Sequence, residues 1–432
     1  MPPPLPEQGM EVWFVGSRSA LFWLALKSGF WTVLSLGFYR FWMKTRLRRW
    51  YWSSIRPGGH PLEYTGDPWE KLLGFFIAVV ILTFYIGIVN LALMFVSFSF
   101  FQSSAVGYSA SFIGVIPIWF YAQYRARRYV LGRTRWRGVR FGLVKGAWGY
   151  AWRALVHWLV TICTLGLLWP RMTFYLEKYK TDRTYFGSAR LVQGGHWRML
   201  YRAAVPFAAA VLLTALLGVW LVWIDPLTTD GSTPFEEIFT EWENSEELAF
   251  AFAFLGWERP SRLFLAIPVI MFLIYGAVHY RFASKRILAN HKHSEGVRMR
   301  STLNGLRVSM IYVLGTTIAY SILVFGIIAI VIIAFGLFGS STFLEEQLGT
   351  GDPLGDLPRW LSVGIIAVLY LSVFLFWGVL HHVFVTYPLM QHMALTLTLL
   401  NVAGLAQVSQ RARDEFAEAE GFAEALDLGA AI

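Results

Sequence analysis

The chain has 432 residues, of which 56% are hydrophobic and only 15% are charged, with a net charge of +10 and a mean hydropathy of +0.50. A soluble domain carries about 25% charged residues, so this composition excludes an ordinary soluble protein, and its apolar content excludes a disordered one. The single cysteine, Cys163, excludes an intrachain disulfide and a multi-cysteine metal site.

Residues 1–11 are rich in proline and contain no Lys or Arg, so we expect a flexible tail rather than an export signal. Six later stretches hold the roughly 20 apolar residues that a membrane-spanning helix needs: 71–98, 106–124, 201–224, 263–283, 308–338 and 360–389. Two further apolar stretches, 20–42 and 148–170, contain charged or titratable residues, namely Lys27 in the first and Arg153 and His157 in the second.

The loops between these stretches alternate in charge. Basic loops are expected in the cytoplasm, where we predict that tags would report at Gly59, Gly138, Gly187 and Glu295. The neutral or acidic loops are expected outside, with tags at Ser103, Thr233 and Gly349. Basic loops flank 148–170 on both sides, so we expect this stretch to be re-entrant or interfacial; the alternative is an ordinary span that leaves a basic loop outside.

An internal repeat links the two ambiguous stretches, because residues 12–66 resemble residues 139–194 at an offset of about 128. A Leu-Gly pair stands at matching points, with Gly37 in the first copy and Gly166 in the second. We expect both glycines to be structural, either by allowing a break in the helix or by allowing close packing. The stretch 20–42 is therefore expected not to span either.

Three Gly-rich elements follow basic segments and alternate in polarity, which predicts short strands or hairpins that form a small cytoplasmic sheet or cap: 59–66, 136–142 and 185–194. From about Ala394 the sequence predicts an amphipathic helix that ends in an acidic segment, 414–427. This acidic segment is either a solvated tail or a segment that docks on the basic loops.

These features predict an all-α polytopic membrane protein with about six transmembrane helices and two re-entrant or interfacial helices. Its expected divisions are a flexible tail (1–11), a first membrane repeat (12–138), a second membrane repeat (139–284), a third partial repeat (285–393) and a cytoplasmic amphipathic and acidic tail (394–432).

Several motifs together resemble a known family. They are the run from Leu34 to Trp42, Arg48-Arg49-Trp-Tyr-Trp52, Leu62-Glu-Tyr-Thr-Gly66, Arg127-Arg128-Tyr129, the run from Arg133 to Gly142 and the run from Ala423 to Gly429. Over residues 12–430 the chain resembles the YjgN-like bacterial inner-membrane proteins, which are classed under a domain of unknown function. The resemblance implies an inner-membrane location and supplies no catalytic residue.

The candidate residues follow from their place in the membrane. Lys27, Arg153 and His157 are membrane-embedded polar candidates, since such groups mark functional sites or snorkel to the interface. Arg48, Arg49, Arg127 and Arg128 are candidates for contact with lipid headgroups. His381 and His382 are adjacent in sequence, so their rings point about 100° apart and favour packing over metal binding. We expect Cys163 to be a buried, inert thiol.

No sequence motif for a nucleophile, a phosphate loop or a metal set occurs, so we expect no enzyme activity, no cofactor and no metal. Membrane lipids are the expected partners and nucleic acid is not; the sequence leaves protein partners and oligomeric state open. Two functions stay open: transport of an anionic or lipidic solute, and a non-transporting role that binds anionic headgroups or a partner through the basic cytoplasmic face.

Overall fold

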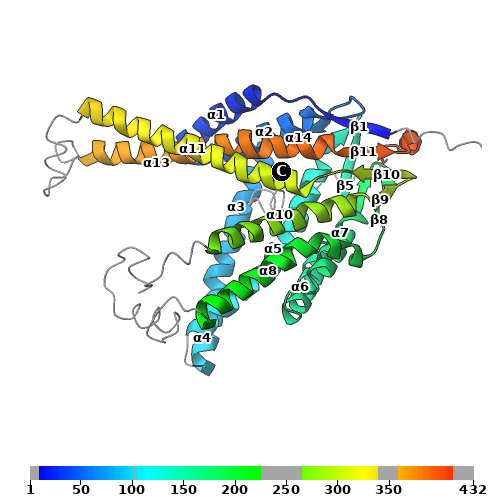
Figure 1. The fold of residues 1–432 in the computed structure, drawn as a ribbon, viewed down its shortest axis with the longest axis horizontal. Coiled ribbons are helices and arrows are strands. Elements are labelled where there is room, and N and C mark those ends of the chain that lie inside the picture. Colours follow the sequence, from blue (N-terminus) through cyan, green and yellow to red (C-terminus); the bar gives the residue numbers. More distant parts are fainter. Residues whose placement is uncertain (1–8, 102–103, 225–264, 339–358, 412–432) are drawn as a thin grey trace, which may run out of the picture. The chain divides into compact units, whose positions relative to one another are not determined.

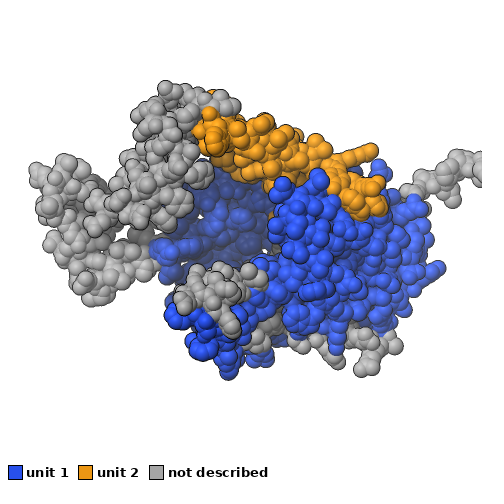
Figure 2. Space-filling view, turned by 90° about the horizontal axis from the view of Figure 1, so that it is seen from below, with its two compact units in different colours: residues 1–195, 288–303, 310–432 blue, residues 196–287, 304–309 orange. Residues whose placement is uncertain are grey.

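The computed structural model describes residues 9–101, 104–224, 265–338 and 359–411. The chain falls into two compact units, which Figure 2 distinguishes by colour. Unit 1 comprises Met1–Gly195, Leu288–Leu303 and Met310–Ile432, and unit 2 comprises His196–Ile287 and Asn304–Ser309.

The protein is mostly helical, as the sequence predicts (Figure 1). The α-helices are α1 (Arg18–Leu34), α2 (Arg40–Ser54), α3 (Pro68–Phe84), α4 (Asn90–Phe101), α5 (Ser104–Gly132), α6 (Ala147–Cys163), α7 (Trp169–Thr181), α8 (Tyr201–Val219), α10 (Ala266–Ala289), α11 (Gly305–Phe338), α13 (Arg359–His381) and α14 (Tyr387–Leu395). Short π-helices are η1 (Tyr85–Val89), η3 (Trp220–Ile224) and η5 (His382–Thr386), and 3₁₀ turns are η2 (Trp197–Leu200) and η6 (Val402–Gln407).

Among the described residues, four helical segments are long and apolar enough to cross a membrane, and they indicate a membrane protein: Trp197–Trp223, Ala266–Ala289, Gly305–Ala329 and Tyr370–Leu395. Their large apolar side chains, such as Leu212, Ile274 and Phe325, are exposed. The predicted spans 71–98 and 106–124 also lie in helices, α3–η1–α4 and α5. The predicted external positions Ser103, Thr233 and Gly349 lie outside the described residues.

The stretches 20–42 and 148–170 each form the first arm and the turn of a helical hairpin. Helix α1 is followed by α2, and α6 by α7. In the first hairpin Leu36 and Gly37 have φ of +51° and +93°, and in the second Leu165 and Gly166 have φ of +49° and +84°. A hydrogen bond closes each turn, from Phe38 N to Ser35 O and from Leu167 N to Thr164 O. Two successive positive φ angles define a type I′ turn, which reverses the chain within two residues.

Gly37 and Gly166 are therefore needed for backbone conformation rather than for packing. A Cβ atom built on either glycine meets nothing within 4 Å. Both φ angles lie in the left-handed region that a residue with a side chain rarely adopts. Of the two structural roles that the sequence leaves open for these glycines, the geometry supports the bend.

The two hairpins are held by equivalent contacts. The hydroxyl of Thr32 lies 3.7 Å from the sulfur of Met43, and that of Thr161 lies 3.9 Å from the sulfur of Met172. Each of these positions, like the turn residues, recurs 129 residues later in the chain. Because backbone angles and side-chain contacts recur together, the two hairpins share one local design.

Each hairpin packs on another helical segment of unit 1. In the first, α1 and α2 surround an apolar cluster with α13 and α14: Leu21, Ala25, Leu47, Tyr51, Val379 and Tyr387. In the second, α6 and α7 surround one with α5 and β5: Phe120, Tyr124, Leu143, Tyr150, Ala151, Ala154, Met172, Leu176 and Tyr179. A tyrosine on each neighbouring helix bonds to the chain just before the hairpin. Tyr387 on α14 donates to Gly16 O, and Tyr124 on α5 donates to Val144 O.

The Gly-rich elements form strands, as predicted, and they join strands from distant parts of the chain. The strands are β1 (Gly9–Phe14), β2 (Ile55–Pro57), β3 (Leu62–Tyr64), β4 (Thr134–Trp136), β5 (Val139–Leu143), β6 (Thr184–Phe186), β7 (Ala189–Arg190), β8 (Val192–Gln193), β9 (Lys292–Ser294), β10 (Val297–Ser301) and β11 (Leu397–Leu400). One sheet has the order β2-β1-β11-β10-β9-β8 and the other β3-β4-β5-β6-β7. Residues 58–61 link β2 to β3 and Leu191 links β7 to β8, so the chain connects the two sheets at both ends.

The prediction of a helix from about Ala394 is wrong for Leu397–Leu400, which form strand β11. This strand lies between β1 and β10, with Leu399 opposite Met10 on one side and Met299 on the other. Two neighbouring strand edges offer backbone hydrogen bonds that a helix there would leave unpaired, and this tertiary demand outweighs the local pattern. The acidic segment 414–427 lies outside the described residues.

Candidate functional site

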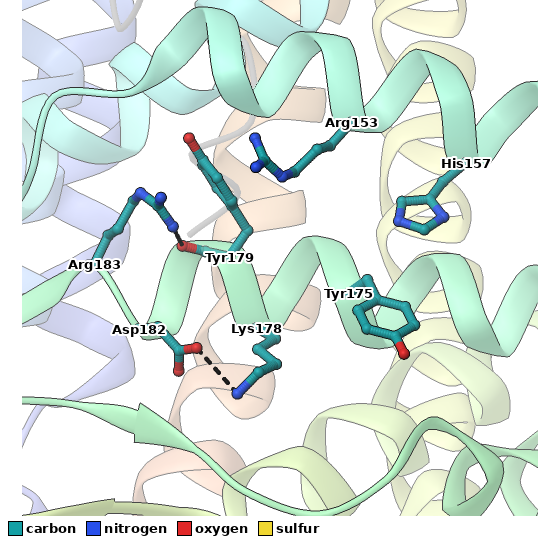
Figure 3. Close-up of a pocket in the computed structure, with 7 residues that line it drawn as sticks. All are labelled: Arg153, His157, Tyr175, Lys178, Tyr179, Asp182 and Arg183. Carbon is teal, nitrogen blue, oxygen red and sulfur yellow. Dashed lines mark hydrogen bonds and ion pairs between the residues drawn. The ribbon is translucent and has the colours of Figure 1, made fainter.

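Two of the three membrane-embedded polar candidates meet in a pocket on the second hairpin. Arg153 and His157 lie one turn apart on α6 and face α7 (Figure 3). Lys27 does not line this pocket, because it lies on α1 in the other hairpin and is exposed. The position of α6 that is equivalent to Lys27 is Val156, so the two hairpins differ at this point.

The pocket has a volume of about 310 Å³ and is lined by α6, α7 and the residues that follow α7: Arg153, His157, Tyr175, Lys178, Tyr179, Asp182 and Arg183. The side chains on α7 and just after its end come from positions 175, 179 and 183 and from positions 178 and 182, which follow the four-residue spacing of two adjoining helix faces. With three cations and one carboxylate, the pocket carries an excess of positive charge.

Tyr179 lies between two guanidinium groups in the centre of the pocket (Figure 3). The guanidinium carbon of Arg153 is 4.8 Å from the centre of the ring, and that of Arg183 is 3.7 Å away. The Tyr179 hydroxyl donates to Gly146 O at 3.0 Å. The ring thus holds both arginines by cation–π contact, which orients their N–H groups without an acidic partner.

The remaining groups modulate this charge. Lys178 donates to Gln193 O at 2.8 Å and lies 3.0 Å from the carboxylate of Asp182. The His157 ring stacks on Tyr175 at 5.5 Å with nearly parallel planes. Burial, together with the charges of Arg171 and Arg153, lowers the pKa of His157 and favours its neutral imidazole. The arrangement suits an anion with several oxygen atoms.

A cluster that the sequence did not reveal fixes α7 beside the pocket. Glu177 lies 2.9 Å from Lys292, 3.0 Å from Lys180 and 3.5 Å from Arg127. Burial alone would raise the pKa of the Glu177 carboxyl, but the charges of Lys180, Lys292 and Arg127 hold it well below its ordinary value. The carboxylate therefore ties α7 to α5 and to β9.

The four arginines proposed for headgroup contact lie in different surroundings. Arg48 is buried, with its guanidinium over the rings of Trp52 and Tyr64, so the prediction that it contacts headgroups is wrong. Arg127 is partly neutralised by Glu177 and Arg128 is half-buried. Arg49 is exposed and donates to Gly66 O at 2.9 Å, so headgroup contact by this residue stays a prediction.

Three other sequence candidates are placed as follows. Cys163 is exposed at the end of α6, so the prediction of a buried thiol is wrong. The rings of His381 and His382 are 6.5 Å apart and nearly perpendicular. Within the described part of the chain, no group of three or more His, Cys, Asp or Glu residues is arranged to hold a metal ion.

Sequence reasoning found Arg153 and His157 from charge inside an apolar stretch, but it missed the α7 half of the pocket. Tyr175, Tyr179 and Arg183 repeat at four-residue intervals, which would have marked one helix face. The signal was obscured because α7 belongs to a long basic segment in which no single cation stands out.

No curated protein and no solved structure matches this chain. A family model described as "Bacterial protein of unknown function (DUF898)" matches residues 10–332. This match covers both hairpins and most of the strands, and it agrees with the YjgN-like resemblance of the motifs. The chain therefore belongs to this bacterial family of proteins of unknown function.

Proposed function

We propose that this protein is an integral inner-membrane protein whose α6–α7 hairpin dips into the cytoplasmic leaflet and binds an anionic lipid headgroup in the basic pocket. This is the non-transporting alternative that the sequence left open. The observation that carries the proposal is the presence, on one hairpin, of an exposed apolar stripe and a pocket with excess positive charge.

The apolar stripe runs along α6 at spacings of three and four residues: Trp148, Trp152, Val156, Leu159 and Ile162, which are 43–69% exposed. Residues at this spacing share one face of a helix. At the tip, Leu165 is 97% exposed and Leu167 is 67% exposed. A tip and a helix face of this composition suit insertion into lipid and would be unfavourable in water.

The distance from the tip places the pocket at headgroup depth. Arg153 lies 12 positions before Leu165, and Lys178 lies 13 positions after it. The helical parts of these arms, 153–163 and 169–178, rise about 15 and 14 Å at 1.5 Å per residue, before the turn at the tip is counted. Half the hydrocarbon thickness of a bilayer is about 15 Å. A hairpin whose tip reaches the midplane therefore sets both cations just outside the hydrocarbon, where lipid phosphates lie.

The chemistry of the pocket fits a phosphate diester. Arginine binds phosphate oxygens through paired N–H donors, and the Tyr179 ring holds two arginines in position for this. Neutral His157 adds a hydrogen-bonding nitrogen at the side nearer the tip. Asp182 is neutralised by Lys178, so it opposes an anion less than a free carboxylate would.

The finer topology belongs to the same proposal. Six spans are supported by helices at all six predicted stretches, and a cytoplasmic position for the sheets is supported by the basic residues in their strands and turns. Duplication of the hairpin unit is supported by the recurrence of its turn and contacts at an interval of 129 residues.

Transport of an anionic or lipidic solute is the second candidate. One observation favours it: the π-helix η5 interrupts the candidate span Tyr370–Leu395. Such irregular turns are frequent at functional sites in helices. Accumulation of an anion in proteoliposomes, lost on substitution in η5, would favour transport over headgroup binding alone.

Headgroup binding is tested by native mass spectrometry of the full chain purified with phosphatidylglycerol. We expect retained lipid to fall several-fold in the double variant Arg153→Gln, Arg183→Gln. The matched control is Arg298→Gln, Arg300→Gln, which removes two exposed arginines from β10. Equal lipid retention in the pocket variant and the control would refute the proposal. Displacement of the retained lipid by inorganic phosphate alone would indicate that the ligand is a free anion.

A further inference from the structure

The five-stranded sheet has one aromatic face and one basic face. On the first, Trp136 and Phe141 pack against Phe186. Strand register places the residues of the other face in neighbouring rows, since Glu63 pairs with Arg135, Arg135 pairs with Arg140, and Tyr185 pairs with Arg190. We name this set the arginine face: Glu63, Arg135, Arg140, Tyr185 and Arg190.

The arginine face carries a like-charge pair. Arg135 and Arg140 stand directly opposite each other on β4 and β5, an arrangement that destabilises a strand pair. Arg190 adds a third cation, and Glu63 supplies one carboxylate in the same set. An anionic segment placed on this face would complement its positive charge.

The described chain ends on this face. Ser409 accepts a hydrogen bond from Ser188 N at 2.8 Å and donates one to Ser188 Oγ at 3.2 Å. The next side chain, Gln410, accepts from Arg140 N at 2.9 Å. A Cβ atom added to Gly187 would contact the Ser409 carbonyl, so the β6–β7 turn is shaped for this crossing.

The last described residue is also docked on the arginine face. The guanidinium carbon of Arg411 lies 4.1 Å from the centre of the Tyr185 ring. Only a few residues later the sequence becomes acidic, with one arginine at 413 and six carboxylates: Asp414, Glu415, Glu418, Glu420, Glu424 and Asp427. The first carboxylate is three residues from Arg411, within about 10 Å along the chain.

We propose that the acidic segment 414–427 binds the arginine face of its own chain and shields it from other polyanions. A short connection gives the segment a high effective concentration at this face, so individually weak pairs suffice to hold it. Charge complementarity and the anchored position of 408–411 select this occupant over an anionic membrane surface. The inference does not rest on the proposed headgroup pocket, which lies on α6 and α7.

The test uses the full chain in zwitterionic nanodiscs, with Cys163→Ser and a spin label attached at Ala417→Cys. We expect the label to be immobilised at low salt and released at about 0.5 M salt, because salt screens and weakens exposed charge pairs. The ratio of immobile to mobile label should fall roughly tenfold when the cations of the face are removed: Arg135→Gln, Arg140→Gln, Arg190→Gln.

A second variant guards against loss of folding in the first, since it leaves the sheet unchanged: Glu415→Gln, Glu418→Gln, Glu420→Gln. It should release the label to the same extent, whereas the control Arg298→Gln, Arg300→Gln should not. A label that is mobile in the unsubstituted segment overturns the proposal. So does a label released by the acidic-segment variant but not by the arginine variant, which would place the segment elsewhere. Immobilisation only in anionic nanodiscs would make the membrane the occupant and also overturn it.

Discussion

Replacement of Glu177 by Gln tests whether one carboxylate fixes the second hairpin. Glu177 lies within 3.5 Å of three cationic groups on α5, α7 and β9. Glutamine keeps the shape of the side chain and removes its charge. Arg127, Lys180 and Lys292 would then face one another without the anion that holds them together.

The magnitude follows from burial. Removing one partner of a fully buried ion pair costs about 3–5 kcal/mol. The Glu177 side chain is 19% exposed, and its partners are 16–33% exposed, so solvent screens part of the repulsion. We therefore expect Glu177→Gln to lower the free energy of unfolding by about 2 kcal/mol.

The assay is thermal unfolding of the full chain in detergent, followed by tryptophan fluorescence. The control is Glu11→Gln, which makes the same change at an exposed position of β1. Because the pKa of Glu177 is lowered on folding, its contribution is present above the ordinary value of 4.5 and is lost as the pH falls below it. The difference between wild type and Glu177→Gln should therefore shrink on acidification below pH 4.5. Equal melting temperatures for the two variants at pH 7 would refute the reasoning.

Three further predictions follow from the same geometry. Gly37→Leu and Gly166→Leu should each reduce the amount of folded protein, because each destabilises the fold by about 1 kcal/mol or more, and the double variant should be worse. Replacement by Ala should be nearly as harmful. Expression assays in which Ala is tolerated and Leu is not would point to close packing instead. A cysteine at Gly138 should react with an impermeant thiol reagent only after the cytoplasmic side is opened, and labelling from outside would reverse the proposed topology. Arg48→Gln should lower the melting temperature without changing lipid retention. Arg49→Gln should lower lipid retention without changing the melting temperature. Lipid loss from Arg48→Gln alone would contradict the structural role of Arg48.

The amino-acid sequence was sufficient for properties that depend on local composition. Apolar length identified helices at all six predicted spans, and glycine-rich alternation identified the strands near Trp136 and Tyr185. The Leu-Gly pairs marked the two turns, because the second turn position has a φ of +93° or +84°, which glycine adopts more readily than any residue with a side chain. The basic segments likewise predicted where the strand-rich part of the chain would be.

Tertiary structure decided which residues meet. Glu177 and Lys292 are more than a hundred residues apart, and nothing in either local sequence indicates that they form an ion pair. Strand β11 was predicted as helix because three of its four residues are leucine, a good helix former, and only the open edges of β1 and β10 select the extended form. The pocket of Arg153 and Tyr179 exists because the hairpin folds α7 back onto α6, a contact that helical periodicity alone cannot assign to a partner.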